Sequence, residues 1–137
     1  MSSVYYFMFA VIIAVIGIAI NFKIHMDKLK ENPANRESIQ SKFFIGIAII
    51  EVIPIILVIF GFMNLTPVSN INELLLPGII TILSALLGLL FVFLQSKVDV
   101  TEEAKGMINT FTFIGFTLMM TFPIIAIVSM FIMITGA

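Results

Sequence analysis

The sequence predicts an all-α integral membrane protein with four transmembrane helices that form two repeated helical hairpins. Composition gives the first indication, because 61% of the 137 residues are hydrophobic and 11% are charged, whereas soluble domains are about half apolar and about a quarter charged. The apolar residues form long uninterrupted segments without strand-like alternation, which favours helices and excludes a β-barrel. A third observation is that the second half of the chain repeats the pattern of the first.

Four apolar segments are each long enough to cross a bilayer, which takes about 20 helical residues. They comprise residues 4–24, 42–65, 74–95 and 107–134. The first segment has no basic residue ahead of it and is too long for a signal-peptide core, so we expect it to be retained.

The basic residues indicate an orientation. All seven Lys and Arg residues lie in the first connection (22–41, with Lys42 at its edge) and the third (96–106), and the second connection (64–73) has none. The positive-inside rule predicts that connections 22–41 and 96–106 are cytoplasmic and that both termini lie outside. We expect a multi-pass protein of a bacterial-type plasma membrane, with His25 solvated in the first connection.

An internal repeat relates the two halves. FIGIAIIEVIPII at residues 44–56 aligns with FIGFTLMMTFPII at 113–125 at an offset of 69, and the first and third segments match at an offset of 71. We therefore expect a first hairpin at residues 1–68 and a second at 69–137. Small residues recur on one face of the first and third segments, which favours close helix packing in lipid. They are Ala10, Ala14 and Gly17 in the first segment, and Thr81, Ala85 and Gly88 in the third.

One carboxylate stands near the middle of the second segment. Glu51 would cost on the order of 3 kcal/mol there if charged, and such residues usually carry ions or protons. Desolvation favours its neutral form. Met120 replaces it in the repeat. The alternative is that Glu51 merely hydrogen-bonds a neighbouring helix.

A proline follows the carboxylate closely. Pro54 has no N–H to donate to the carbonyl of Ile50, so we predict a kink or loosened turn beside Glu51. Pro123 predicts the same in the second hairpin. The expected site is Glu51, supported by Pro54, Gly17 and Ala14.

These residues resemble the c-type proteolipids of F-type ATP synthases, which form the rotor ring. The resemblance lies in the polar connection ENPANRESIQ, at residues 31–40, followed by FIGxAxxExxPII, and covers residues 32–63 most closely. Two hairpins with one carboxylate are similar to the vacuolar-type proteolipids. The family's Arg-Gln-Pro connection stands here as Glu31-Asn32-Pro33, with Arg36 nearby.

The resemblance implies a non-catalytic subunit that carries an ion on Glu51 in a rotor ring. The implied partners are further c-type proteolipids or copies of this chain, a stator subunit that supplies an arginine, central stalk subunits, and lipid. The stalk would meet Asn32, Pro33 and Arg36. Protons are favoured over sodium, because Val52 is not the hydroxyl residue typical of sodium sites and residues 4–20 contain no Gln.

Other chemistry finds no support in the sequence. It has no phosphate-binding loop, metal-ligand cluster or nucleophile–base pair, and we expect no cofactor, metal or nucleic acid. Two other functions stay open. One is a c-like membrane protein without a rotor role, in assembly or structure, and the other is a small independent proton-coupled channel.

Overall fold

The computed structural model describes residues 2–136, and its regular structure is helical throughout that range. The long helices are α1 (Ser3–Glu31), α2 (Arg36–Ile50), α3 (Val52–Met63), α4 (Leu75–Gln95) and α5 (Lys105–Thr135), with short 3₁₀ helices η1 (Pro33–Asn35) and η2 (Ile71–Leu74). Helices α2 and α3 are consecutive parts of one rod. Counting them together, four helical rods are long and apolar enough to cross a membrane. The predicted all-α, multi-pass membrane fold is therefore confirmed.

The first connection is shorter than the sequence suggests. The prediction is a loop at residues 22–41, but α1 continues to Glu31 and α2 begins at Arg36, so that only Asn32 and η1 separate them. The prediction is wrong because Lys and Glu are good helix formers, and a polar helix end needs no lipid. The prediction of a solvated His25 fails for the same reason. Its ring is buried on α1, with Nδ1 2.8 Å from the Asn21 carbonyl oxygen.

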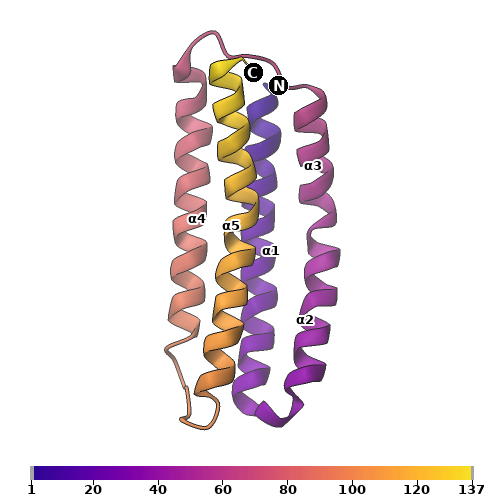
Figure 1. Cartoon of the computed structure of the whole chain (residues 1–137), viewed down its shortest axis with the longest axis vertical. Coiled ribbons are helices and arrows are strands. Elements are labelled where there is room, and N and C mark those ends of the chain that lie inside the picture. The colour runs from indigo at the N-terminus through magenta and orange to yellow at the C-terminus, as the bar shows by residue number, and fades with distance from the viewer. Residues whose placement is uncertain (1, 137) are drawn as a thin grey trace.

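Helix α1 occupies the centre of the molecule (Figure 1). It packs against α2 and α3 on one side and against α4 and α5 on the other, whereas α2–α3 meets α4–α5 only marginally. The rods run side by side. The ends of the described chain lie beside the 64–74 connection at one end of the molecule, and the two basic connections lie at the other (Figure 1).

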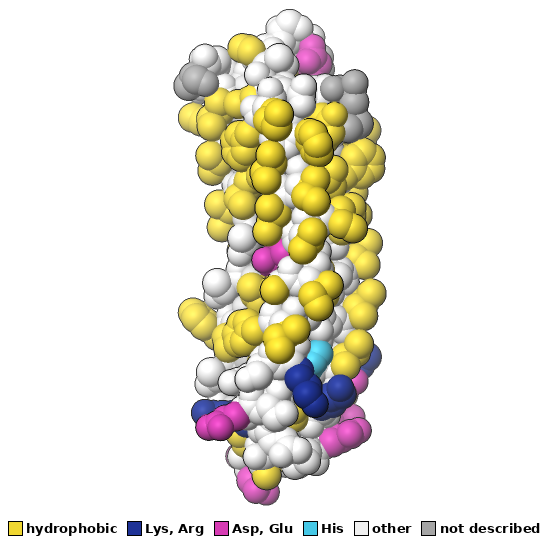
Figure 2. All heavy atoms as spheres, turned by 90° about the vertical axis from the view of Figure 1, so that its right-hand side faces the viewer, with side chains coloured by type: hydrophobic (Ala, Val, Ile, Leu, Met, Phe, Trp, Pro, Cys, Tyr) yellow, Lys and Arg dark blue, Asp and Glu magenta, His cyan; other side chains and the backbone are white. Residues whose placement is uncertain are grey.

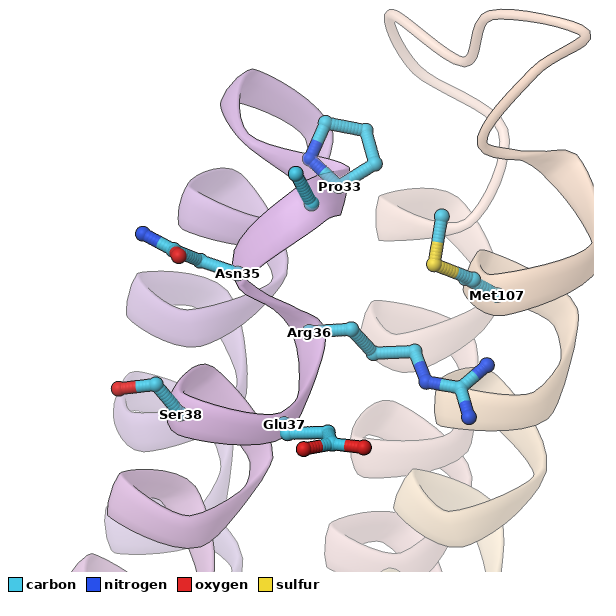
Figure 3. A pocket seen from close by; sticks show the side chains of 7 residues that line it. Pro33, Asn35, Arg36, Glu37, Ser38 and Met107 are labelled. Carbon is cyan, nitrogen blue, oxygen red and sulfur yellow. The ribbon is translucent and has the colours of Figure 1, made fainter.

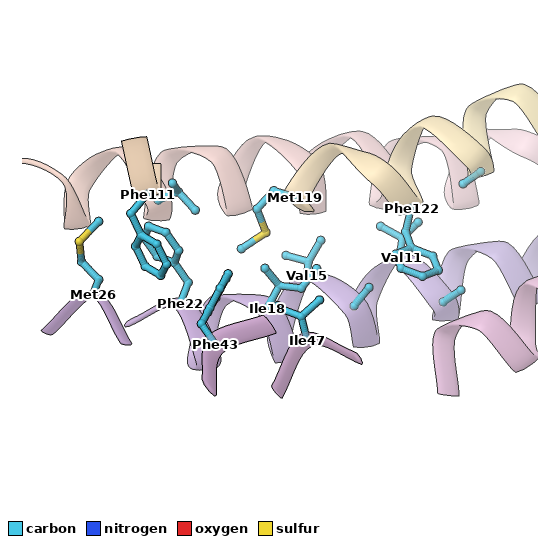
Figure 4. Packing of buried hydrophobic residues seen from close by; sticks show 14 of the residues in the cluster. Val11, Val15, Ile18, Phe22, Met26, Phe43, Ile47, Phe111, Met119 and Phe122 are labelled. Atoms are coloured by element: carbon cyan, nitrogen blue, oxygen red, sulfur yellow. The ribbon is translucent and has the colours of Figure 1, made fainter. Parts of the chain in front are cut away.

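Aromatic rings fill the core near the basic end. Phe22 stacks on Phe111 of α5 with their ring centroids 5.0 Å apart, and Phe43 of α2 meets the same Phe111 ring edge-on at 4.7 Å (Figure 4). The predicted small faces are also in the core. Ala10 and Ala14 are buried on α1, as are Thr81, Ala85 and Gly88 on α4.

The first hairpin (α1 with α2–α3) and the second hairpin (α4 with α5) make corresponding close contacts. Each contact brings a glycine of one helix against a side chain of the other. In the first hairpin the pairs are Gly17–Ile50, Gly46–Asn21 and Gly61–Phe7; at offsets of 71 and 69 they recur as Gly88–Met119, Gly115–Val92 and Gly78–Met130. In the third pair the large and small residues have exchanged helices. The two hairpins therefore share the register in which their helices pack.

Candidate functional site

The helix is interrupted at Glu51, as Pro54 predicted. Helix α2 ends at Ile50 and α3 begins at Val52, and Glu51 between them has φ −75° and ψ −8°. Its N–H donates to the Ile47 carbonyl, and its carbonyl accepts from the N–H of Ile55, each at 2.9 Å. Because proline has no N–H, the Ile50 carbonyl lacks its regular helical donor. The loosened turn thus carries the carboxylate.

Pro123 does not have this effect. Helix α5 continues through it, so the predicted kink in the second hairpin is wrong. Helix α5 packs against both α1 and α4, and both Phe122 and Pro123 are buried. The α2–α3 rod has α1 alone as a major neighbour. Packing on two sides keeps α5 straight where proline alone would bend it.

The Glu51 side chain is half-buried among apolar neighbours. Val52 and Ile53 beside it are exposed, and Pro54 is buried against the core. On the face formed by α2 and α3, an acidic side chain lies at mid-height between hydrophobic groups above and below it (Figure 2). Among residues 2–136, no side chain hydrogen-bonds or forms a salt bridge with the Glu51 carboxyl. The carboxyl is therefore open to exchange with an outside group.

The residues expected to support the site lie against it. Ala14 is buried on α1, and the Cα of Gly17 approaches Ile50, the residue before Glu51, so closely that a Cβ there would overlap the Ile50 side chain. In the second hairpin, Met120 is half-buried at the position that corresponds to Glu51. The described residues contain no group of three or more His, Cys, Asp or Glu side chains that could hold a metal ion.

Asn21 is a positioning residue that the sequence interpretation missed. Its place near a span end is typical of an ordinary interfacial polar residue, but its side chain is buried and its Nδ2 donates to the Phe43 carbonyl at 3.0 Å. It also lies directly against Gly46. The signal was present, because Asn21 continues the small face of Ala14 and Gly17 at helical spacing. It fixes α2 against α1 about one turn below Glu51.

The predicted stalk-facing residues lie at the tip of the first hairpin. Pro33 opens η1, and Arg36 begins α2. The Arg36 side chain extends toward the start of α5, where Met107 lies, and the Glu37 carboxylate lies next to it (Figure 3). Together with Asn32, which is exposed, they make a polar surface at the basic end, far from Glu51.

Pro54→Ala should join α2 and α3 into one continuous helix. The new N–H at position 54 can donate to the Ile50 carbonyl, so we expect amide hydrogen exchange at residues 51–54 to slow about tenfold, the equivalent of one recovered hydrogen bond. The matched control is Pro123→Ala, whose helix is already continuous. Equal slowing around both positions, or none at Glu51, would contradict this account of the interruption.

Comparison with protein families gives one match. Residues 4–64 match the family model described as the ATP synthase C subunit. This stretch runs from the first turn of α1 to the residue after α3, and so contains the whole first hairpin with Glu51. Searches of curated proteins and of solved structures found no match. Through this hairpin, the chain belongs to the ATP synthase C-subunit family of non-catalytic membrane proteins.

Proposed function

We propose that this chain is a rotor-ring proteolipid that carries protons on Glu51 in the membrane sector of a rotary ATP synthase or ATPase. The observation that carries the proposal is a single carboxylate at a break in a membrane-spanning helix, within the part of the chain that matches the C-subunit family. The chain itself performs no ATP chemistry, which belongs to partner subunits.

Protons suit this site better than sodium ions. A sodium ion needs several oxygen ligands, whereas the Glu51 carboxyl has apolar neighbours and makes no hydrogen bond within residues 2–136. Protonated, it can face lipid at little cost, and opposite a fixed cation it would ionise and release the proton. The membrane potential supplies about 2.3 kcal/mol per charge per 100 mV.

The fixed cation must come from another subunit. Arg36 is the only arginine in the sequence, and it lies at the tip of the hairpin rather than at the depth of Glu51. A stator subunit with a membrane-embedded arginine is the partner that this chemistry requires. Asn32, Pro33 and Arg36 would meet the central stalk.

The chain would carry one proton per pair of hairpins. We assign residues 1–68 to a first c-like hairpin and residues 69–137 to a second that lacks the carboxylate, because the close contacts of the first recur in the second while Met120 replaces Glu51. A ring made of this chain alone would carry fewer protons per turn than one with a site in every hairpin. Such a ring would favour pumping over synthesis.

The proposed orientation places the basic end in the cytoplasm and both termini outside. All Lys and Arg residues lie in the two connections at one end of the molecule. A reporter that is active only in the cytoplasm should therefore be silent at the C-terminus and active when inserted after Ala34. Activity at the C-terminus would overturn this orientation.

A hydrophobic carbodiimide tests the proton site. The reagent attacks protonated carboxyls, so mass spectrometry should find the adduct on Glu51 and little on Glu102 or Glu103, which are exposed in a connection. Labelling mainly at Glu102 and Glu103 would contradict a protonated site within the membrane. Protection of Glu51 by sodium would overturn the assignment to protons.

A further inference from the structure

Two of the four helical rods are poorly covered by the rest of the molecule. In the most apolar window of each rod, 17% of the residues are buried for residues 33–63 (α2–α3) and 28% for residues 71–95 (α4), against 50% for α1. The two rods lie on opposite sides of α1 and share no substantial contact. Each therefore presents a free apolar side.

The free side of α4 repeats a buried side of α1. On α1, the stripe Met8, Val11, Val15 and Phe22 packs within the molecule. An offset of 71 converts these positions into Ile79, Ile82, Leu86 and Phe93, which are all exposed. The contrast is large, since Val11 and Phe22 are 0% exposed while Ile82 and Phe93 are 51% and 47% exposed. Helix α4 thus carries the same packing stripe as α1 without a neighbour to cover it.

The free side of α2–α3 repeats a buried side of α5. On α5, Phe111, Phe122 and Ser129 are buried. An offset of 69 converts these positions into Lys42, Ile53 and Phe60, which are all exposed. Phe122 is 4% exposed and Ile53 is 58% exposed. The side of α5 that meets α1 thus has a counterpart on α2–α3 that nothing in the molecule covers.

We propose that the α4 stripe of one copy packs on the α2–α3 stripe of a second copy, in the register by which α1 packs on α5. This rests on the proposed ring function and specifies the partner as this chain itself. The α1–α5 register is given by the stacked pair Phe22–Phe111. Eleven residues further along each helix, about three turns, Val11 and Phe122 occupy the same register (Figure 4).

The repeat converts both pairs into contacts between copies. Phe22–Phe111 becomes Phe93 against Lys42, and Val11–Phe122 becomes Ile82 against Ile53. The lower pair is chemically suitable, because an ammonium group beside an aromatic ring gains cation–π energy at the level of the headgroups. The upper pair joins two branched aliphatic side chains. No unpaired charge is buried by either contact.

The geometry of the two stripes decides the kind of assembly. The contact joins different surfaces of the two copies, so each copy retains one free stripe after pairing. Such heterologous contacts close into a ring when the rotation between copies divides a full turn. The same step relates the two hairpins inside the chain, so the contact between copies continues the contact within one copy.

Cysteine cross-linking in membranes tests the interface, because the native sequence contains no cysteine. We expect a short bismaleimide to convert the Lys42→Cys, Phe93→Cys double variant and the Ile53→Cys, Ile82→Cys double variant into ladders of covalent multimers. Each single-cysteine variant should stay a monomer. Ladders and monomers together would identify a head-to-tail contact.

The matched control is the Ile55→Cys, Ile82→Cys double variant. Ile55 is also exposed and lies at the depth of Ile53, but two residues turn it by about 200° to the other side of α3. We expect about tenfold less multimer from this pair, because its thiols meet only by random collision. A ladder as strong in the control, no ladder in either test pair, or a single-cysteine variant that forms dimers would overturn the inferred interface.

The proposed function and the interface fail by different results. Cross-linking does not depend on Glu51, so the ladders should persist when Glu51→Gln is added to each double variant. Ladders without carbodiimide labelling of Glu51 would leave the interface standing and contradict the proton site. Labelling of Glu51 without ladders would overturn the interface and leave the proton site standing.

Discussion

Gly115→Ala should lower the free energy of unfolding by about 1–3 kcal/mol, the usual cost of overpacking a full core. A Cβ at this position would lie 2.6 Å from Cε2 and 3.0 Å from Cδ2 of Phe22, and 3.1 Å from Cγ1 of Val92. The Phe22 ring has no room to withdraw, because it is fully buried and stacks on Phe111. Helix α5 must therefore move away from α1.

Gly106→Ala is the control on the same helix. A Cβ at Gly106 meets nothing within 4 Å, and replacing a helical glycine by alanine favours the helix by up to about 1 kcal/mol. Denaturant titration of the purified protein in detergent should rank the stabilities as Gly106→Ala, then wild type, then Gly115→Ala. A Gly115→Ala variant as stable as wild type would contradict the close approach of α1 and α5.

The sequence was sufficient to predict the membrane fold. Long apolar segments, together with seven basic residues confined to two connections, allow a four-helix multi-pass arrangement with little freedom. The small faces were predictable too, because alanine and glycine at helical spacing mark the places where backbones approach each other. Ala14 and Gly88 are buried as this argument requires.

Residues whose state depends on tertiary packing could not be assigned in this way. His25 was expected in a loop, but α1 continues past it and the Phe43 ring lies 5.7 Å from its own ring. Pro54 and Pro123 have nearly identical local sequences, yet only the α2–α3 rod breaks. The difference comes from the number of neighbours that pack against each helix, which no local pattern records.

The candidate site was partly predictable. Glu51 stands out in the sequence because an acid in an apolar segment is rare and expensive, and Pro54 correctly indicated a broken turn beside it. Asn21 was missed because a polar residue near a span end usually faces the interface. Its hydrogen bond to Phe43 depends on how closely Gly46 brings α2 to α1.

Glu51→Gln should abolish proton transfer while leaving the protein folded and assembled. A neutral amide keeps the length and hydrogen-bonding capacity of the protonated acid, but it has no proton that it can release and regain. Neighbouring packing should change little, because the Glu51 side chain is half-buried and makes no hydrogen bond within residues 2–136. Met120→Glu is not expected to restore transfer to this variant, since Thr121 and Phe122 replace Val52 and Ile53 around that position.

Proton flux through membrane vesicles that contain the chain with its partner subunits tests the central claim most directly. The control is Glu73→Gln, which removes an exposed acid of η2 whose Oε1 accepts a hydrogen bond from Ser69 at 2.9 Å. We predict no flux above background for Glu51→Gln and a rate close to wild type for Glu73→Gln, with equal amounts of assembled complex. Flux at the wild-type rate through Glu51→Gln vesicles would contradict Glu51 as the proton carrier.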